Sequence, residues 1–260
     1  MIGLPTDGGD VGHGDGPFLV AAKSHAAVQH YLIPRPMAIK SFRMARILVI
    51  NPNCSRDCSD GISAAIAPFR LPTGPEIDVA TLAGGPKAIY SWRDWHAVVE
   101  PLCDLVAHAR ADVFVIACAS DPGIEAARAS TTTPVLGVFR CAATAAAARA
   151  ERFGVIALVN ASKSRHLAAL RAIGLEGRLA GEIAMNVSLE ALLDPRAARA
   201  RLIEAGHALV KSGSEAVILG CTGMAHHRAA IEAEIGVPVI EPCQAAAGQA
   251  LSIVLPTAIS

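Results

Sequence analysis

The 260-residue sequence has few aromatic residues, no net charge and no long apolar run. Aromatic residues make up 4% of the chain and hydrophobic residues 52%, so aliphatic side chains must build the core. The 23 basic and 23 acidic residues balance without a basic stripe, which argues against a nucleic-acid partner. No apolar run approaches the roughly 18 residues that a membrane-spanning helix needs, so we expect no membrane partner.

Disulfide, metal and nucleotide signals are also missing. Seven cysteines without regular spacing do not make the framework of a disulfide-rich secreted domain, so we expect reduced thiols in a cytoplasmic protein. Cys54 and Cys58 lie four residues apart, but no further ligands follow at zinc-site spacing, and we expect no metal. No Gly-rich phosphate loop follows the first strand, which disfavours a nucleotide.

The first 43 residues differ from the rest. Residues 1–16 are rich in Gly and Asp and show no periodicity, so we expect residues 1–43 to be disordered or a loosely attached extension. A secretory signal would begin basic and carry a longer apolar stretch. The folded part is expected to begin at Met44.

From Met44 onward, apolar strand-like runs alternate with Ala-rich helical segments. This alternation predicts an α/β fold with parallel sheets. We expect strands over residues 46–50, 77–81, 113–117, 135–138, 154–159, 217–219 and 239–241. We expect one helix that ends near residue 67, one that opens at residues 121–122, and helices over residues 92–110, 144–152, 163–173, 195–212, 222–235 and 244–254. Residues 179–194 are ambiguous and could form a short strand and one helical turn. Ligands of such sheets bind at the carboxyl ends of strands, where Asn51, Cys118, Asn160 and Cys221 fall.

Two stretches of the sequence repeat one pattern. In each, an acidic residue stands six positions before a cysteine, with a short Val- and Ile-rich run between them. The pairs are Asp112 with Cys118 and Glu215 with Cys221. Two such strand-to-cysteine units predict two similar half-domains, each with one thiol at a strand end. Packing alone would not explain polar, glycine-containing flanks in both copies.

Two thiols facing one cleft could exchange a proton on carbon. A helix following each cysteine is expected to lower the thiol pKa from about 8.5 and favour the thiolate. One thiolate would remove the proton and the opposing thiol would return one to the other face. Backbone N–H groups with Ser120 and Thr222 could hold the enolate charge. The small neighbours Ala119 and Gly223 would let a ligand approach the backbone.

Four motifs together resemble the aspartate/glutamate/hydantoin racemase superfamily, and most of all its hydantoin racemase branch. They are Asn51-Pro52-Asn53, the segment ACASDPG at 117–123, PVLG at 134–137 and GCTGM at 220–224. The resemblance covers Met44 to the C-terminus and leaves residues 1–43 unmatched.

The resemblance implies a cofactor-independent racemase with two pseudo-symmetric Rossmann-like lobes and the active site in the cleft between them. It implies a first lobe of residues 44–139 plus about 242–260 and a second lobe of residues 140–241. Cys118 and Cys221 would be the catalytic acid/base pair. The substrate-binding residues would be Asn51, Ala119, Ser120, Asn160, Thr222 and Gly223.

A 5-monosubstituted hydantoin, or a relative such as allantoin, is the preferred small-molecule substrate because its ring carbonyls acidify C5–H. One alternative is an aspartate or glutamate racemase, and another is a maleate-type cis–trans isomerase in which one cysteine attacks carbon. A non-enzymatic alternative is a two-lobed binding protein. The chain is a possible homo-oligomer. His226-His227 is better interpreted as a solvated helix face, His166 as structural and Asp121 as an N-cap.

Overall fold

The structure is a computed structural model that describes residues 44–193 and 195–255. The extension predicted for residues 1–43 therefore lies outside the described residues. Within the described part, no helix is both long and apolar enough to span a membrane.

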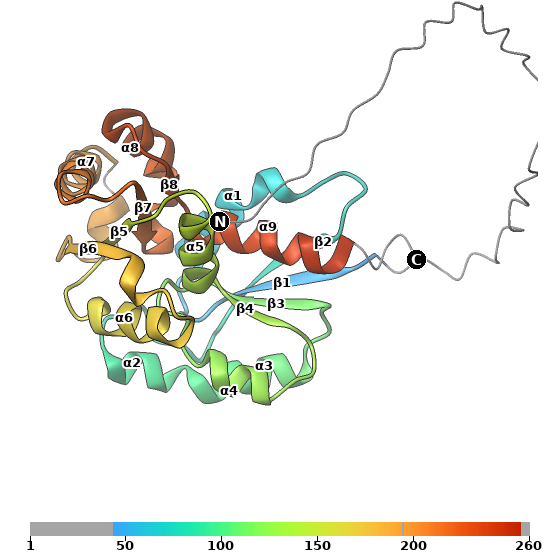
Figure 1. Ribbon diagram of the computed structural model, residues 1–260. Helices are drawn as coiled ribbons and strands as arrows, with labels where there is room; N and C mark the ends of the chain where they lie inside the picture. The colour runs from blue at the N-terminus through green and yellow to red at the C-terminus, as the bar shows by residue number, and fades with distance from the viewer. Residues whose placement is uncertain (1–43, 194, 256–260) are drawn as a thin grey trace, which may run out of the picture. The chain divides into compact units, whose positions relative to one another are not determined.

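Two four-stranded parallel sheets form the frame of the fold (Figure 1). The first, with order β2-β1-β3-β4, contains β1 (Arg46–Asn51), β2 (Glu76–Thr81), β3 (Val113–Ile116) and β4 (Val135–Gly137). The second, with order β6-β5-β7-β8, contains β5 (Phe153–Ala157), β6 (Leu179–Ala184), β7 (Ala216–Gly220) and β8 (Val239–Ile240).

The two sheets have the same strand order, so the second half repeats the topology of the first. In each sheet the central pair is parallel and in register, as in Ile50 with Ile116 and Ala157 with Gly220. The predicted α/β fold with two pseudo-symmetric parallel-sheet lobes is confirmed. Strands β3 and β7 occupy the same position in the two strand orders. The residues that follow them therefore lie at equivalent positions on the carboxyl edges of the two sheets.

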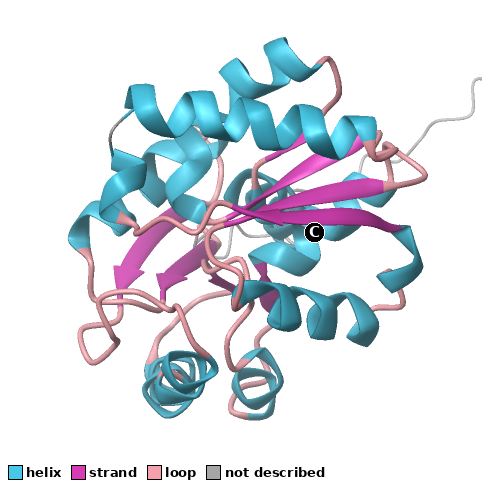
Figure 2. Ribbon diagram, turned by 90° about the vertical axis from the view of Figure 1, so that its left-hand side faces the viewer, coloured by secondary structure: helices cyan, strands magenta, loops and turns pink. Residues whose placement is uncertain are grey.

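Helices cover both faces of each sheet, as Figures 1 and 2 show. On the first sheet, α1 (Arg56–Ala65) packs on one face, and α3 (Val99–His108) and α4 (Ile124–Ala129) pack on the other. On the second sheet, α5 (Val138–Ala147) and α6 (Ser162–Ala172) pack on one face, and α7 (Pro195–Lys211) and α8 (Arg228–Ile235) on the other. Short 3-10 helices are η1 (Ala67–Phe69), η2 (Glu176–Arg178), η3 (Glu190–Leu193) and η4 (Thr222–His227).

The last helix, α9 (Pro242–Val254), packs against the first sheet. Its small buried residues Ala246, Ala247 and Ala250 belong to the same cluster as Ile47 of β1. This packing supports the proposal that the first lobe comprises residues 44–139 and the C-terminal helix. Helix α5 contributes to the cores of both sheets, so it joins the lobes.

Two helices differ from the sequence-based expectation. The helix expected over 92–110 is divided at Val98 into α2 (Trp92–Ala97) and α3. Pro101 lies in the first turn of α3 and has no N–H to continue the hydrogen-bonding pattern of α2, which explains the division. The helix expected over 144–152 begins at Val138, directly after β4.

Asp121 caps a different helix from the one expected. Its carboxylate accepts hydrogen bonds from the backbone N–H groups of Phe139 (2.8 Å) and Arg140 (3.0 Å), at the start of α5. Helix α4 instead follows Gly123, whose φ of 66° is left-handed and which provides no side-chain cap. Asp121 therefore ties the loop after β3 to the helix that joins the two lobes.

The Asp121 carboxylate occupies space that only a glycine leaves open. A Cβ on Gly137 would lie 2.3 Å from its Cγ. Asp121 itself adopts a φ of 45°, a left-handed value that is uncommon for a residue with a side chain. Burial raises the pKa of Asp121 to about 6, against the lowering effect of its two N–H bonds and of Arg140.

We predict that Asp121→Ala lowers the free energy of unfolding by about 2 kcal/mol, because it leaves buried N–H groups without an acceptor. Urea denaturation measures the change. Glu125→Ala is the matched control, since this exposed carboxylate pairs with Arg140 at the surface and its loss should change stability by less than about 0.5 kcal/mol. Equal effects of the two substitutions would contradict the role of Asp121.

Candidate active site

Cys118 and Cys221 line the same cavity, which encloses about 50 Å³. Cys118 follows β3 by two residues, and Cys221 directly follows β7. Both side chains keep partial exposure. The structure therefore brings together the two thiols that the repeated sequence pattern singled out.

Most of the sequence-predicted binding residues lie at this cavity. Ala119, Ser120 and Thr222 line it together with the two cysteines. Gly223 lies in the wall of a neighbouring groove, and its added Cβ would be 3.6 Å from the Cys221 sulfur.

Asn51 lies behind the cavity rather than in its wall. Its side chain is fully buried, and its amide nitrogen lies 3.0 Å from the Asn53 side-chain oxygen, the Ser55 carbonyl and the Ser59 hydroxyl. Asn51 thus holds the turn after β1, and its neighbour Asn53 is the residue of this motif that lines the cavity.

Asn160 also lies outside the lining. Its backbone N–H donates to the side-chain oxygen of Asn186 at 2.9 Å. The segment after β5 reaches the cavity instead through Ser162, Arg165 and His166 at the start of α6.

Several groups around Cys118 partly offset the effect of burial on its pKa. Its sulfur lies 3.5 Å from the Ser120 hydroxyl, and either atom can donate this hydrogen bond. Burial raises the pKa of Cys118 above its ordinary value of 9.0, and the charge of Asp121 adds to this, while the Ser120 hydroxyl, the Ser120 backbone and the charge of Arg165 act in the opposite direction.

Cys221 has fewer such groups. Burial raises the pKa of Cys221 to about 12, the Gly223 backbone N–H lowers it, and the nearby Cys118 and Cys58 raise it further. The two thiols of the repeated pattern are therefore not equivalent.

The expectation that helices lower both thiol pKa values is wrong. Helix α4 begins at Ile124, six residues beyond Cys118, and Cys221 is followed by the 3-10 helix η4 rather than an α-helix. The dipole effect falls off within the first turn of a helix, so burial dominates.

Arg165 is the charged cavity residue that sequence reasoning missed. It is 2% exposed and lies in the first turns of α6. The signal that could have found it is position, because the helix after β5 starts at the same carboxyl edge as the cysteines.

His166 also faces the cavity, although its ring is held by other residues. Its Nδ1 lies 2.6 Å from Glu182, and its ring stacks on Phe139 at 4.4 Å. The structural role expected for His166 agrees with these contacts.

The segment between β2 and α2 crosses from the first lobe to the second. Ala88 and Ile89 line the cavity, and the Tyr90 hydroxyl accepts a hydrogen bond from the Leu189 N–H at 2.9 Å. The indole N–H of Trp92 donates to Ser164 of α6 at 3.0 Å. This segment covers the cavity from the first lobe.

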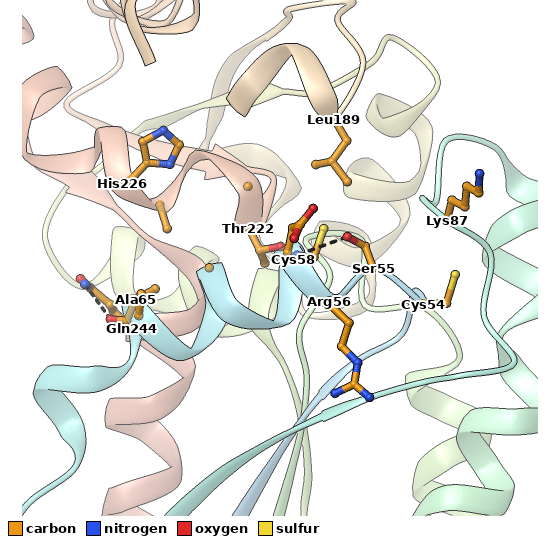
Figure 3. A pocket seen from close by; sticks show the side chains of 15 residues that line it. Cys54, Ser55, Arg56, Cys58, Ala65, Lys87, Leu189, Thr222, His226 and Gln244 are labelled. Atoms are coloured by element: carbon orange, nitrogen blue, oxygen red, sulfur yellow. Dashed lines mark hydrogen bonds between the residues drawn. The ribbon is translucent and has the colours of Figure 1, made fainter. Parts of the chain in front are cut away.

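A larger groove of about 680 Å³ adjoins the cysteine cavity (Figure 3). The two share Cys58, Leu189 and Thr222. Residues of α1 and η4 line the groove, with Lys87 and His226 at its sides. His226 is exposed as expected, but its neighbour His227 is fully buried, so the solvated-face interpretation holds for only one of the two.

Within the described residues, no group of three or more His, Cys, Asp or Glu side chains could hold a metal ion.

Comparison with known proteins connects this geometry to a family. Residues 47–250 match the family model described as Asp/Glu/Hydantoin racemase. A hydantoin racemase from Paenarthrobacter aurescens is 33% identical over 215 residues, covering 80% of this chain and 91% of that protein. The structure of an allantoin racemase from Klebsiella pneumoniae superposes with a TM-score of 0.76 at 30% identity, covering 82% of this chain and 89% of that one. A glutamate racemase from Bacillus anthracis, at 19% identity and a TM-score of 0.63, shares the fold.

The resemblance drawn from the sequence motifs is thereby confirmed. The match includes both sheets, both cysteine segments and most of α9. The chain belongs to the Asp/Glu/hydantoin racemase family and is an isomerase of the racemase type.

Proposed function

We propose that the protein racemises 5-monosubstituted hydantoins, or a relative such as allantoin, without a cofactor. The observation that carries the proposal is that Cys118 and Cys221, which follow equivalent strands of two sheets, line one cavity. The names of the relatives, a hydantoin racemase and an allantoin racemase, support this substrate class.

In the proposed reaction, the Cys118 thiolate takes the proton from C5 of one enantiomer. The C–H electron pair forms a C5–C4 double bond, and the C4 carbonyl becomes an enolate oxygen. The Cys221 thiol then donates its proton to the opposite face of C5, which leaves a thiol on Cys118 and a thiolate on Cys221. The other enantiomer uses the two sulfurs in reversed roles.

The surroundings of the sulfurs favour Cys118 over Cys221 as the thiol that ionises first. Burial raises both pKa values, but a hydroxyl, a backbone group and a guanidinium oppose burial and the Asp121 charge at Cys118, whereas only the Gly223 N–H opposes burial at Cys221. Cys118 is thus the more readily formed base, and Cys221 remains the acid.

The lining favours a hydantoin over a free amino acid. An amino-acid substrate would need a cationic group for its carboxylate and an anionic group for its ammonium. Among the described lining residues, Arg165 could serve the first, but no Asp or Glu is present for the second. A hydantoin ring carries neither charge, and its carbonyls and N–H groups suit Ser120, Thr222 and backbone partners.

The groove next to the cavity can receive the C5 substituent. The cysteine cavity encloses about 50 Å³, so a bulky side chain must extend beyond it. The groove of about 680 Å³ begins at the shared residues Cys58, Leu189 and Thr222. We therefore place the ring between the sulfurs and the substituent along α1.

We predict that Cys118→Ser and Cys221→Ser each lower racemisation of a single-enantiomer hydantoin by at least about 100-fold, because each removes one of two acid/base groups. Optical rotation measures racemisation, and NMR in D2O measures exchange at C5. Each variant should retain exchange for one enantiomer only, and the retained enantiomer should differ between them. Cys103→Ser on α3 is the control. Normal racemisation by either active-site variant would refute the two-thiol mechanism.

A second prediction concerns the difference between the thiols. Iodoacetamide should label Cys118 with a pH midpoint below that of Cys221, because more groups stabilise the Cys118 thiolate. Peptide mass spectrometry at a series of pH values measures the labelling midpoint of each cysteine separately. If iodoacetamide reaches one cysteine more easily, its labelling rate changes but its pH midpoint does not. A lower midpoint for Cys221 would contradict the assignment of Cys118 as the thiol that ionises first.

A third prediction tests the groove. Gly61 lies on α1 in the groove wall, and a Cβ added there meets nothing within 4 Å. Gly61→Trp should therefore add an indole at the groove wall and lower kcat/KM at least about 10-fold for 5-benzylhydantoin, with little effect on 5-methylhydantoin. Gly61→Ala is the matched control and should leave both substrates unaffected. An equal loss for the two substrates would place the substituent elsewhere.

A further inference from the structure

Arg165 brings a buried positive charge to the cavity of the two cysteines. Its side chain is 2% exposed and lines the cavity. Of the lining residues that the structure describes, it is the one Lys or Arg. A guanidinium remains charged at any pH at which the protein is folded.

The hydrogen-bond partners of this guanidinium are all neutral. Nη1 donates to the Ala161 carbonyl at 3.1 Å, Nη2 donates to the Ser162 hydroxyl at 3.2 Å, and both lie 3.4 Å from the Tyr90 carbonyl. The charge lies 5.9 Å from the ring centre of Trp92. Nε is buried and has no partner. One donor of the fork is therefore left for an acceptor that these contacts do not supply.

A buried cation is costly unless an anion accompanies it. Burial lowers the pKa of Arg165, and the two acidic groups that raise it are Cys118 and Asp94. Asp94 is bonded to Ser91 and the start of α2, so it acts only as a nearby charge. His166 follows in sequence and is bonded to Glu182. Of the two acidic groups that act on Arg165, Cys118 is thus the one that lines the cavity and changes its charge in the proposed reaction.

We propose that Arg165, buried in the wall of the cysteine cavity, is a catalytic residue whose guanidinium stabilises the Cys118 thiolate when it forms and the enolate oxygen of the substrate after proton transfer. This inference rests on the proposed racemisation. When the C5 proton moves to the Cys118 sulfur, the negative charge leaves the sulfur and appears on the C4 oxygen. Arg165 keeps its own protons throughout and stabilises that oxygen through its charge.

The proposal explains why the cysteines differ. Arg165 acts on the pKa of Cys118 but is not among the groups that act on Cys221. The fixed positive charge of Arg165 stabilises a thiolate on Cys118 more than one on Cys221. A purely structural Arg165 would instead serve to tie the Tyr90 segment to α6, and its loss would affect folding without changing the thiol chemistry.

The test compares Arg165→Gln and Arg165→Lys with Arg171→Gln. Arg171 lies on the same helix but is exposed and paired with Glu176, so its variant controls for a lost arginine. The pH midpoint of Cys118 labelling by iodoacetamide is measured first, because it needs no substrate. Arg165→Gln should raise this midpoint by about one pH unit or more. Arg165→Lys keeps the charge, so its midpoint should stay close to that of the unsubstituted protein.

Steady-state kinetics then test the second role of Arg165, stabilisation of the enolate oxygen, separately from its effect on the Cys118 thiolate. Arg165→Gln should lower kcat about 100-fold with a smaller change in KM, since the oxygen is charged only in the intermediate. Arg165→Lys should recover only part of kcat because it lacks the planar fork. Guanidinium ion added at millimolar concentration should raise the kcat of Arg165→Ala. Urea denaturation of each variant shows whether it is folded.

An unchanged Cys118 midpoint in folded Arg165→Gln would overturn the role toward the thiolate. Loss of stability with kcat retained would reduce Arg165 to a structural tie. Because the labelling needs no substrate, these outcomes are independent of whether hydantoins are the substrate. Failure of the proposed function would instead appear as normal racemisation by the cysteine variants.

Discussion

The site depends on the desolvation of two sulfur atoms in one small cavity. Away from water, a thiolate is less stable, and burial raises the pKa of both Cys118 and Cys221. A buried thiolate is also a stronger base than one in solvent. Local groups oppose the effect of burial more strongly at Cys118 than at Cys221, so the two sulfurs are unequal in how readily each forms a thiolate.

The duplicated topology determines where the sulfurs lie, and the local sequence determines how they differ. Sheets of identical strand order place β3 and β7 in equivalent positions. Helix α5 contributes to both cores, and Asp121 fixes its first turn to the loop that follows Cys118. The same loop that presents one thiol thus anchors the helix between the lobes, which couples the geometry of the cavity to the packing of the fold.

Much of this arrangement could be predicted from the sequence, because hydrophobic periodicity and the repeated cysteine contexts are local signals. The parallel sheets and the shared cavity of Cys118 and Cys221 followed from them. Thiol acidity could not be predicted, since it depends on how deeply each sulfur is buried and where the next helix begins. Arg165 was missed because its helix is polar and its charge is directed inward only by the tertiary fold. Asn51 carried a family motif, yet its amide holds a turn behind the cavity.

The central claim is that two different sulfurs handle the proton on opposite faces of one carbon. It is tested most directly by following the optical rotation of a single hydantoin enantiomer in D2O. With two bases, the product takes its proton from solvent-exchanged thiol, and the C–D bond formed slows its return. The rotation should therefore pass through zero to the sign of the product before it decays. A monotonic decay to zero, with deuterium entering substrate as fast as product, would contradict the account.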